Sequence, residues 1–222
     1  MFSIACSAGV ASLFGSFPVV RFSRLIAITL SITTASLLAG CDSKTSLARF
    51  HAIDITGAPH AQDFRLKAAD GSERSIADFR GKVVLVFFGF TQCPDVCPTA
   101  LTRAAEVKRL LGPLGDRFQA VFITVDPERD IPAVLREYTQ AFDPSFIGLY
   151  GDLAQTRKTA DDFRVHYAKV PTGSSYTMDH TATSYLFDTT GALRLAASHS
   201  LTATDLAADV SALLDAATAH KK

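Results

Sequence analysis

The chain has 222 residues, of which 48% are hydrophobic and 20% are charged, and its formal net charge is zero. This length and composition allow one globular domain with a hydrophobic core that needs no disulfide staples. The balanced charge and the lack of a long basic run argue against a nucleic-acid partner held through phosphate contacts.

The N-terminal region has the features of a secretory signal. Its first forty residues contain no Asp or Glu, and Arg21 and Arg24 precede an apolar stretch from Leu25 to Leu38. A short positive region followed by a short apolar region is typical of a signal peptide rather than of a membrane span. One explanation for the uncharged residues before Arg21 is a translation start further downstream, at Val19 or Val20.

The end of this region resembles a bacterial lipobox. In the segment 38–41, Leu-Ala-Gly-Cys, the cysteine would be lipidated and would become the mature N-terminus. We therefore expect a signal peptide over residues 1–40 and a lipidated tether over residues 41–52, with Cys41 as the lipid attachment site. An uncleaved anchor and a plain secreted form are the alternatives. Because Asp42 resembles an inner-membrane retention signal, we expect the domain to lie in the periplasm, at the outer face of the inner membrane of the bacterial cell envelope.

Residues 53–219 show strands alternating with helices. Apolar runs predict buried strands, and apolar residues at helical spacing predict amphipathic helices. The expected strands cover residues 83–88, 120–125, 146–150, 184–187 and 193–196, and the expected helices are centred on Leu101–Leu111, Ile131–Tyr138, Ala154–Phe163 and Leu206–Leu214. This order predicts a single α/β domain with a thioredoxin-like fold, a central sheet flanked by helices. Residues 220–222 form a basic tail.

The expected domain contains only two cysteines, Cys93 and Cys97. They follow a buried strand and precede a helix, and their spacing puts them on one side of a helical turn. A disulfide that closes so short a loop would stabilise the fold little, because the entropic benefit grows with loop length. The pair therefore indicates redox chemistry or metal binding more than a structural disulfide.

Other polar residues fall at the ends of the predicted strands, which is where sites form in α/β sheets. Asp126 ends one strand, Asp130 is well placed to cap the next helix, and Asp95 precedes the helix that follows the cysteines. We expect these carboxylates to tune the cysteine site or to contact a partner. His180 comes before the strand that leads into the final hairpin, so a loop could bring its imidazole to the two sulfurs.

Three segments carry a resemblance to a known family. The run Phe-Phe-Gly-Phe-Thr-Gln-Cys-Pro-Asp-Val-Cys-Pro at 87–98, the run Thr-Val-Asp-Pro-Glu-Arg-Asp at 124–130 and the pair Asp179-His180 are similar to those of the Sco/SenC family. The resemblance implies a membrane-tethered copper chaperone that helps to assemble the CuA centre of cytochrome c oxidase. It also implies that Cys93, Cys97 and His180 are the copper ligands. The expected partner is subunit II of the oxidase or another copper acceptor protein.

The chemistry of the three side chains agrees with copper. Thiolates are soft donors that suit Cu(I), and imidazole accepts either copper oxidation state. A structural zinc site normally has four ligands, and only three candidates are present. Three ligands also leave room for a receiving protein to approach the ion.

Thiol–disulfide exchange with the cysteines of an acceptor copper site is the alternative function. A position at a helix N-terminus, with Pro98 as the first helical residue, is expected to favour the thiolate of Cys97. However, the Cys-x-x-x-Cys spacing is one residue longer than that of thioredoxin-type oxidoreductases. A copper or redox sensor is a third possibility, and we do not expect a turnover enzyme.

Overall fold

The computed structural model describes residues 50–219. They belong to a compact unit that starts at Ala48. The expected signal peptide, the lipidation site Cys41, most of the tether and the tail at 220–222 lie outside the described residues. Within the described part of the chain, no helix has the length and apolar character that a membrane span requires.

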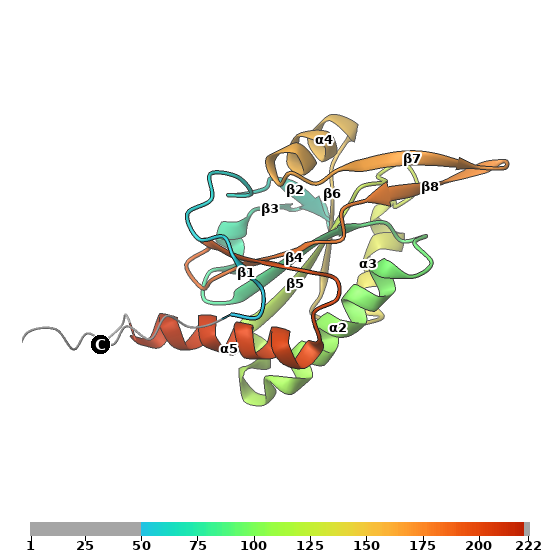
Figure 1. Cartoon of the computed structure of the whole chain (residues 1–222). Helices are drawn as coiled ribbons and strands as arrows, with labels where there is room; N and C mark the ends of the chain where they lie inside the picture. Colours follow the sequence, from blue (N-terminus) through green and yellow to red (C-terminus); the bar gives the residue numbers. More distant parts are fainter. Residues whose placement is uncertain (1–49, 220–222) are drawn as a thin grey trace, which may run out of the picture. The chain divides into compact units, whose positions relative to one another are not determined.

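The core of the domain is a mixed sheet of eight strands (Figure 1). Their spatial order is β1-β10-β9-β4-β5-β6-β2-β3. The strands are β1 (Ile53–Asp54), β2 (Leu66–Ala68), β3 (Glu73–Arg74), β4 (Val83–Gly89), β5 (Phe118–Thr124), β6 (Ile147–Tyr150), β9 (Ser184–Phe187) and β10 (Leu193–Ala197). Two short 3₁₀ helices, Ile76–Phe79 and Gly112–Arg117, lie in the connections.

The central strands β4 and β5 are parallel, and every one of their residues is buried. Continuous apolar runs such as that of β4 are typical of parallel strands covered by helices on both faces. The register pairs Val83 with Phe118 and Gly89 with Thr124, so the two strands end together. The segment that contains the two cysteines follows β4 directly, at this shared end of the two strands.

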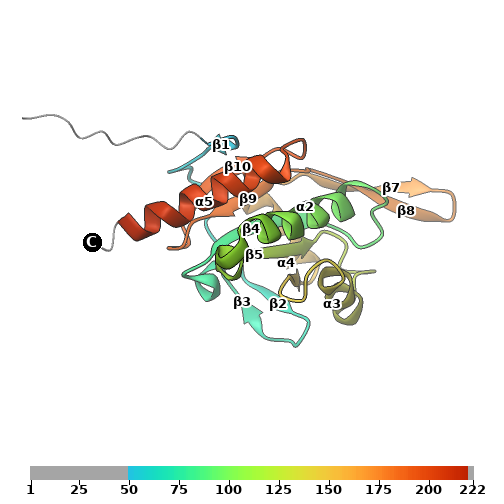
Figure 2. The same ribbon diagram turned by 90° about the horizontal axis from the view of Figure 1, so that it is seen from below.

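Helices cover both faces of the sheet. They are α2 (Val96–Leu110), α3 (Pro132–Gln140), α4 (Leu153–Asp162) and α5 (Ala203–Ala219). Helices α2 and α5 lie side by side on one face, and α4 lies on the opposite face (Figure 2). The predicted apolar stripe of α2 is buried at Leu101, Ala104 and Val107. The α/β class, the central sheet flanked by helices and the thioredoxin-like arrangement are thus confirmed.

A two-stranded hairpin, absent from the sequence-based expectations, projects from the domain (Figure 1). It consists of β7 (Tyr167–Thr172) and β8 (Ser175–His180), which pair with each other and form a separate sheet. The strands carry few buried residues, so the alternation that reveals a half-buried strand is weak. The expectation that His180 lies in a loop is wrong, because it is the last residue of β8.

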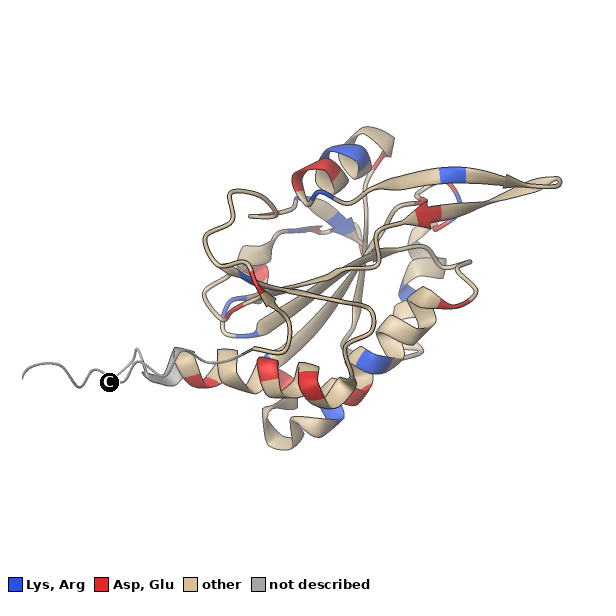
Figure 3. Cartoon of the chain, in the orientation of Figure 1, with Lys and Arg blue, Asp and Glu red and all other residues tan. Residues whose placement is uncertain are grey.

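Charged residues of both signs are interspersed over the helices and strands of the described part (Figure 3).

One buried carboxylate holds the first described residues to the last helix. Asp209 of α5 is 1% exposed and accepts hydrogen bonds from the backbone N–H groups of His51 and Ala52, both at 2.8 Å. Residues at the end of the expected tether are therefore bonded to the folded domain.

Candidate metal centre

The two cysteines lie where β4 ends and α2 begins. Cys93 is half-buried in the connecting loop, and Cys97 is fully buried in the first turn of the helix. The backbone N–H of Cys97 donates a hydrogen bond of 3.4 Å to the sulfur of Cys93. Both thiols are free, so the two sulfurs are present as separate donors on one side of the turn.

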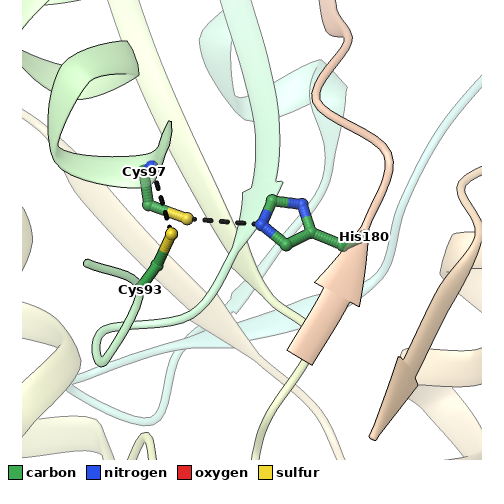
Figure 4. Close-up of side chains that lie close together, drawn as sticks. All are labelled: Cys93, Cys97 and His180. Carbon is green, nitrogen blue, oxygen red and sulfur yellow. Dashed lines mark hydrogen bonds between the residues drawn. The ribbon is translucent and has the colours of Figure 1, made fainter. Parts of the chain in front are cut away.

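His180 brings a ring nitrogen to this sulfur pair from the end of β8 (Figure 4). Its Nε2 lies 3.4 Å from the Sγ of Cys97. Its Nδ1 lies 3.1 Å from the carbonyl oxygen of Thr181, and an N–H there would donate to that oxygen. This assigns the proton of the neutral ring to Nδ1 and leaves Nε2 free to accept a proton or to bind a metal.

The donor atoms of Cys93, Cys97 and His180 all lie within 4.8 Å of one another. Within residues 50–219, no other set of three or more His, Cys, Asp or Glu side chains forms such a cluster. The arrangement therefore joins two soft sulfur donors and one nitrogen donor around a single point, as the sequence-based hypothesis requires.

Aromatic rings screen part of the site from water, since Cys97 is buried and Cys93 and His180 are half-buried. The imidazole of His180 packs against the rings of Phe87 and Phe90, with centroid distances of 6.0 and 5.9 Å. Burial lowers the pKa of His180, and burial raises the pKa of Cys97. Without a metal, both groups are therefore held in their neutral forms at neutral pH.

The expectation of a favoured Cys97 thiolate is wrong for the metal-free protein, because desolvation opposes the charged sulfur. Helix α2 also begins at Val96, so Pro98 is its third residue and not its first. A cation that enters the site would supply the positive charge that the buried sulfur lacks.

Gly89, the last residue of β4, is required by the close approach of Cys97. A Cβ atom at this position would lie 2.7 Å from the Cys97 sulfur and 2.8 Å from a ring carbon of Phe122. Any side chain here would thus displace the thiol or the ring. The glycine stands in the sequence motif, but only the packing reveals its role.

Asp130 holds the cysteine loop to the end of β5. It is 1% exposed, and its carboxylate accepts hydrogen bonds from the backbone N–H of Thr91 at 3.0 Å and the hydroxyl of Thr91 at 2.6 Å. A third hydrogen bond of 2.6 Å comes from the hydroxyl of Thr124. The expectation that Asp130 caps a helix is wrong, since Ile131 is the N-cap of α3 and the Asp130 side chain is engaged with the two threonines.

Asp126 links the same turn to the hairpin that carries His180. Its buried carboxylate accepts hydrogen bonds from Arg129 Nε at 2.5 Å and from the hydroxyl of Tyr176 at 2.9 Å. Tyr176 lies on β8, four residues before His180. Both carboxylates thus support the segments that hold the three donor groups, and neither belongs to the cluster of donors itself.

Comparison with known proteins identifies the family of the chain. The family model described as SCO1/SenC matches residues 54–215. The chain belongs to the SCO1/SenC family.

Three relatives illustrate the similarity to other SCO1/SenC proteins. A SCO2-like protein of Rickettsia felis is 40% identical over 132 residues, which are 58% of this chain and 64% of that protein. The structure of Bradyrhizobium japonicum ScoI with copper bound is 43% identical, with a TM-score of 0.63, and the match covers 68% of this chain and 97% of ScoI. A SCO1/SenC family lipoprotein from Bacillus anthracis is 27% identical, with a TM-score of 0.59, over 68% of this chain and 92% of that structure.

The remaining carboxylate of the sequence-based hypothesis, Asp95, lies outside the centre of this SCO1/SenC site. It is the N-cap residue of α2 and is exposed, and its side chain makes no capping hydrogen bond. The structure therefore does not bring Asp95 to the sulfurs. A cavity of about 650 Å³ between residues 59–65 and helix α4 is also lined by none of the three donor residues.

Two supporting residues were missed by sequence reasoning. Arg129 and Tyr176 belong to segments that were singled out for their motifs, but neither was a candidate site residue. Each supports the site only by contacting another segment of the chain. The hydrogen bond from Arg129 to the carbonyl oxygen of Tyr176 is such a contact. Linear spacing gives no signal for such a contact.

Proposed function

We propose that this SCO1/SenC protein is a copper chaperone that binds one copper ion through Cys93, Cys97 and His180. The observation that carries the proposal is the convergence of two sulfurs and one imidazole nitrogen within 4.8 Å. The presence of copper in the structure of the related ScoI supports it.

The donor set fits copper better than zinc. Two thiolates and one imidazole suit Cu(I), and the imidazole also suits Cu(II). The cluster contains no fourth Cys, His, Asp or Glu ligand among the described residues, whereas a structural zinc site is closed by four. An ion with three ligands has an open side through which a second protein can compete for it.

We further propose that the acceptor is the CuA centre of cytochrome c oxidase, in subunit II, or another copper protein of the same compartment. The resemblance of the three motifs to the Sco/SenC family supports this assignment. The lipobox at Cys41 and the lipoprotein relative from Bacillus anthracis support a lipid tether to the outer face of the inner membrane. A tethered domain in the periplasm would meet an acceptor that is itself held at the membrane.

Copper titration of the purified full chain in detergent tests the ligand assignment. In the reduced form we expect one Cu(I) per chain, and we expect Cys93→Ser, Cys97→Ser and His180→Ala each to lower the affinity in competition with a Cu(I) chelator. The Asp95→Ala variant is the control, because Asp95 is exposed and does not belong to the cluster of donor atoms. Unchanged copper binding after replacement of both cysteines would disprove the proposal.

Transfer is tested with a soluble acceptor domain that contains an empty CuA site. The copper-loaded chain should generate the CuA absorption spectrum, and the loaded His180→Ala variant should not. Tethering is tested separately by labelling cells with a radioactive fatty acid. The label should appear in the wild-type chain and be absent from the Cys41→Ser variant.

Thiol–disulfide exchange is the second candidate function, and it is favoured by the two free, adjacent thiols. In this reaction a disulfide of the acceptor would be reduced to two thiols while Cys93 and Cys97 form a disulfide, so two electrons and two protons leave this chain. The chain would then need a dithiol donor to be reduced again. Since exchange requires only the sulfurs, His180→Ala should retain reduction of the acceptor while it loses copper affinity.

A further inference from the structure

The sulfur donors and the nitrogen donor of the site are held by different parts of the molecule. The cysteines lie on the segment that joins β4 to α2, in the core of the domain. His180 lies on β8, which among residues 50–219 forms a ladder with β7 alone. Apart from the chain connections to α4 and β9, the position of the imidazole therefore depends on side-chain contacts between the hairpin and the rest of the domain.

Arg129 makes the most extensive of these contacts. Its Nη1 donates hydrogen bonds to the carbonyl oxygen of Tyr176 at 2.8 Å and to the side-chain oxygen of Gln92 at 3.1 Å. Its guanidinium also lies over the ring of Tyr176, at 3.7 Å from the centroid. Gln92 directly precedes Cys93, so one side chain touches both the cysteine loop and the hairpin.

The guanidinium is itself held in place by a buried carboxylate. The side chains of Arg129 and Asp126 are 17% and 1% exposed, and Nε donates to Oδ2 of Asp126 at 2.5 Å. The same carboxylate accepts the hydroxyl of Tyr176. A planar cation that is hydrogen-bonded at its edge and stacked on an aromatic face has a fixed orientation, which lysine cannot reproduce.

The geometry of β8 transmits this contact to the metal site. Tyr176 and His180 lie four positions apart on one strand, so their side chains point to the same face. Four residues of a strand span about 13 Å. When the contact with Arg129 holds β8 at Tyr176, the His180 side chain is directed toward the sulfurs. If β8 rotated or shifted, the imidazole would move away from them.

We propose that Arg129 is a positioning residue that sets the place of the His180 imidazole relative to the two sulfurs. It touches no donor atom of the site. Its effect on copper passes through Tyr176 and β8, with Gln92 and the ring of Phe90, which lies 5.9 Å from the guanidinium, as further points of contact. This inference rests on the proposed copper site, and it assigns to Arg129 a role that the ligand set alone does not require.

The test measures Cu(I) affinity of the full chain by chelator competition in two backgrounds, wild type and His180→Ala. We expect Arg129→Ala to weaken binding by roughly tenfold in the wild-type background, as is usual for residues that orient a ligand. In the His180→Ala background the same substitution should change affinity by less than about twofold, because the group that it positions is gone. The Arg129→Lys variant should resemble Arg129→Ala more than the wild type.

A matched control is available on α2. Arg109 pairs with Glu106 at the same three-residue spacing, but both side chains are exposed and far along the helix from the cysteines. Arg109→Ala should leave copper affinity unchanged in both backgrounds. With Cu(II), electron paramagnetic resonance of Arg129→Ala should show weakened nitrogen coupling, while the sulfur-to-copper absorption is retained.

A second variant covers the case in which Arg129→Ala does not fold. Tyr176→Leu keeps the pair of Arg129 and Asp126 and removes the ring on which the guanidinium stacks, and it should give the same dependence on the background. Equal losses in both backgrounds would overturn the proposal, as would an Arg129→Ala affinity equal to that of the wild type. The His180→Ala arm alone tests the ligand assignment, so its failure is distinguishable from a failure of the role of Arg129.

Discussion

The carboxylate of Asp130 accepts two hydrogen bonds from Thr91, which lies 39 residues earlier in the chain. This contact ties the start of the cysteine loop to the turn that follows β5. Since Thr124 donates to the same carboxylate, the loop and the strand end share one buried acceptor. The position of the sulfurs thus depends on a group that is not a metal ligand.

The pH dependence of stability should report on Asp130. Burial raises the pKa of this carboxyl above its ordinary value of 3.8, so the folded chain binds its proton more tightly than the unfolded chain. The contribution of this group to the free energy of unfolding is therefore fully present below pH 3.8 and is lost as the pH rises through the higher, folded-state pKa. Denaturation of wild type and Asp130→Asn across this range should show a loss that only the wild type undergoes. Parallel curves would contradict the raised pKa.

The substitution Gly89→Ala should damage the sulfur site directly. The new Cβ would lie 2.7 Å from the Cys97 sulfur, so we expect a loss of about 1–3 kcal/mol in the free energy of unfolding and lower affinity for copper. Gly148→Ala on β6 is the matched control, because its Cβ would meet the Leu135 side chain of α3 at 2.5 Å and neither sulfur is among its nearest atoms. Both variants should be destabilised in chemical denaturation, but only Gly89→Ala should lose copper affinity.

Copper binding should release protons. Burial raises the pKa of the Cys97 thiol, so at neutral pH the metal must displace its proton. Burial lowers the pKa of His180, so the imidazole is already neutral and contributes no proton there. Calorimetry of Cu(I) binding in buffers of different ionisation enthalpy should show release of at least about one proton at pH 7, that of the buried Cys97 thiol, and a rising affinity with pH. The same number from His180→Ala would confirm the sulfurs as the source, and no release at all would refute it.

Asp209 should matter for stability and not for copper. Its replacement by Ala leaves the backbone N–H groups of His51 and Ala52 without their acceptor, and we expect a loss of about 2–4 kcal/mol in the free energy of unfolding. The neighbouring Asp205 is 38% exposed, lies 3.6 Å from the ring of His51 and accepts the hydroxyl of Thr202 at 2.7 Å, so Asp205→Ala should cost less, about 1 kcal/mol or below. Urea denaturation and copper titration of both variants separate the two effects. A reduced copper affinity of Asp209→Ala would contradict this expectation, because it would show that the hydrogen bonds of Asp209 affect the metal site.

Much of the fold could be predicted because its strands and helices carry strong periodic signals. The buried run of β4 and the apolar stripe of α2 fixed the place of the cysteines at a strand end. The distant His180 could be assigned only from its motif, yet the structure brings its ring nitrogen to 3.4 Å from the Cys97 sulfur.

The sequence-based predictions that are wrong concern features that tertiary packing determines. The hairpin of β7 and β8 is mostly exposed, so neither strand shows a clear apolar alternation. The spacing of Asp130 before α3 suits a helix cap, but two threonine hydroxyls from other segments take its carboxylate. The thiolate of Cys97 was expected from the helix terminus alone, and burial outweighs that effect.

Mutations near the two sulfurs and mutations near the His180 imidazole should have different effects on the protein. The sulfurs are joined to the hydrophobic interior, so a change around them endangers folding itself. The imidazole lies on a hairpin that is held to the domain by its chain connections and by side-chain contacts, and these contacts can be strengthened or loosened while the interior stays intact. A substitution that loosens these contacts is thus expected to change how readily a bound ion leaves, without loss of the folded state.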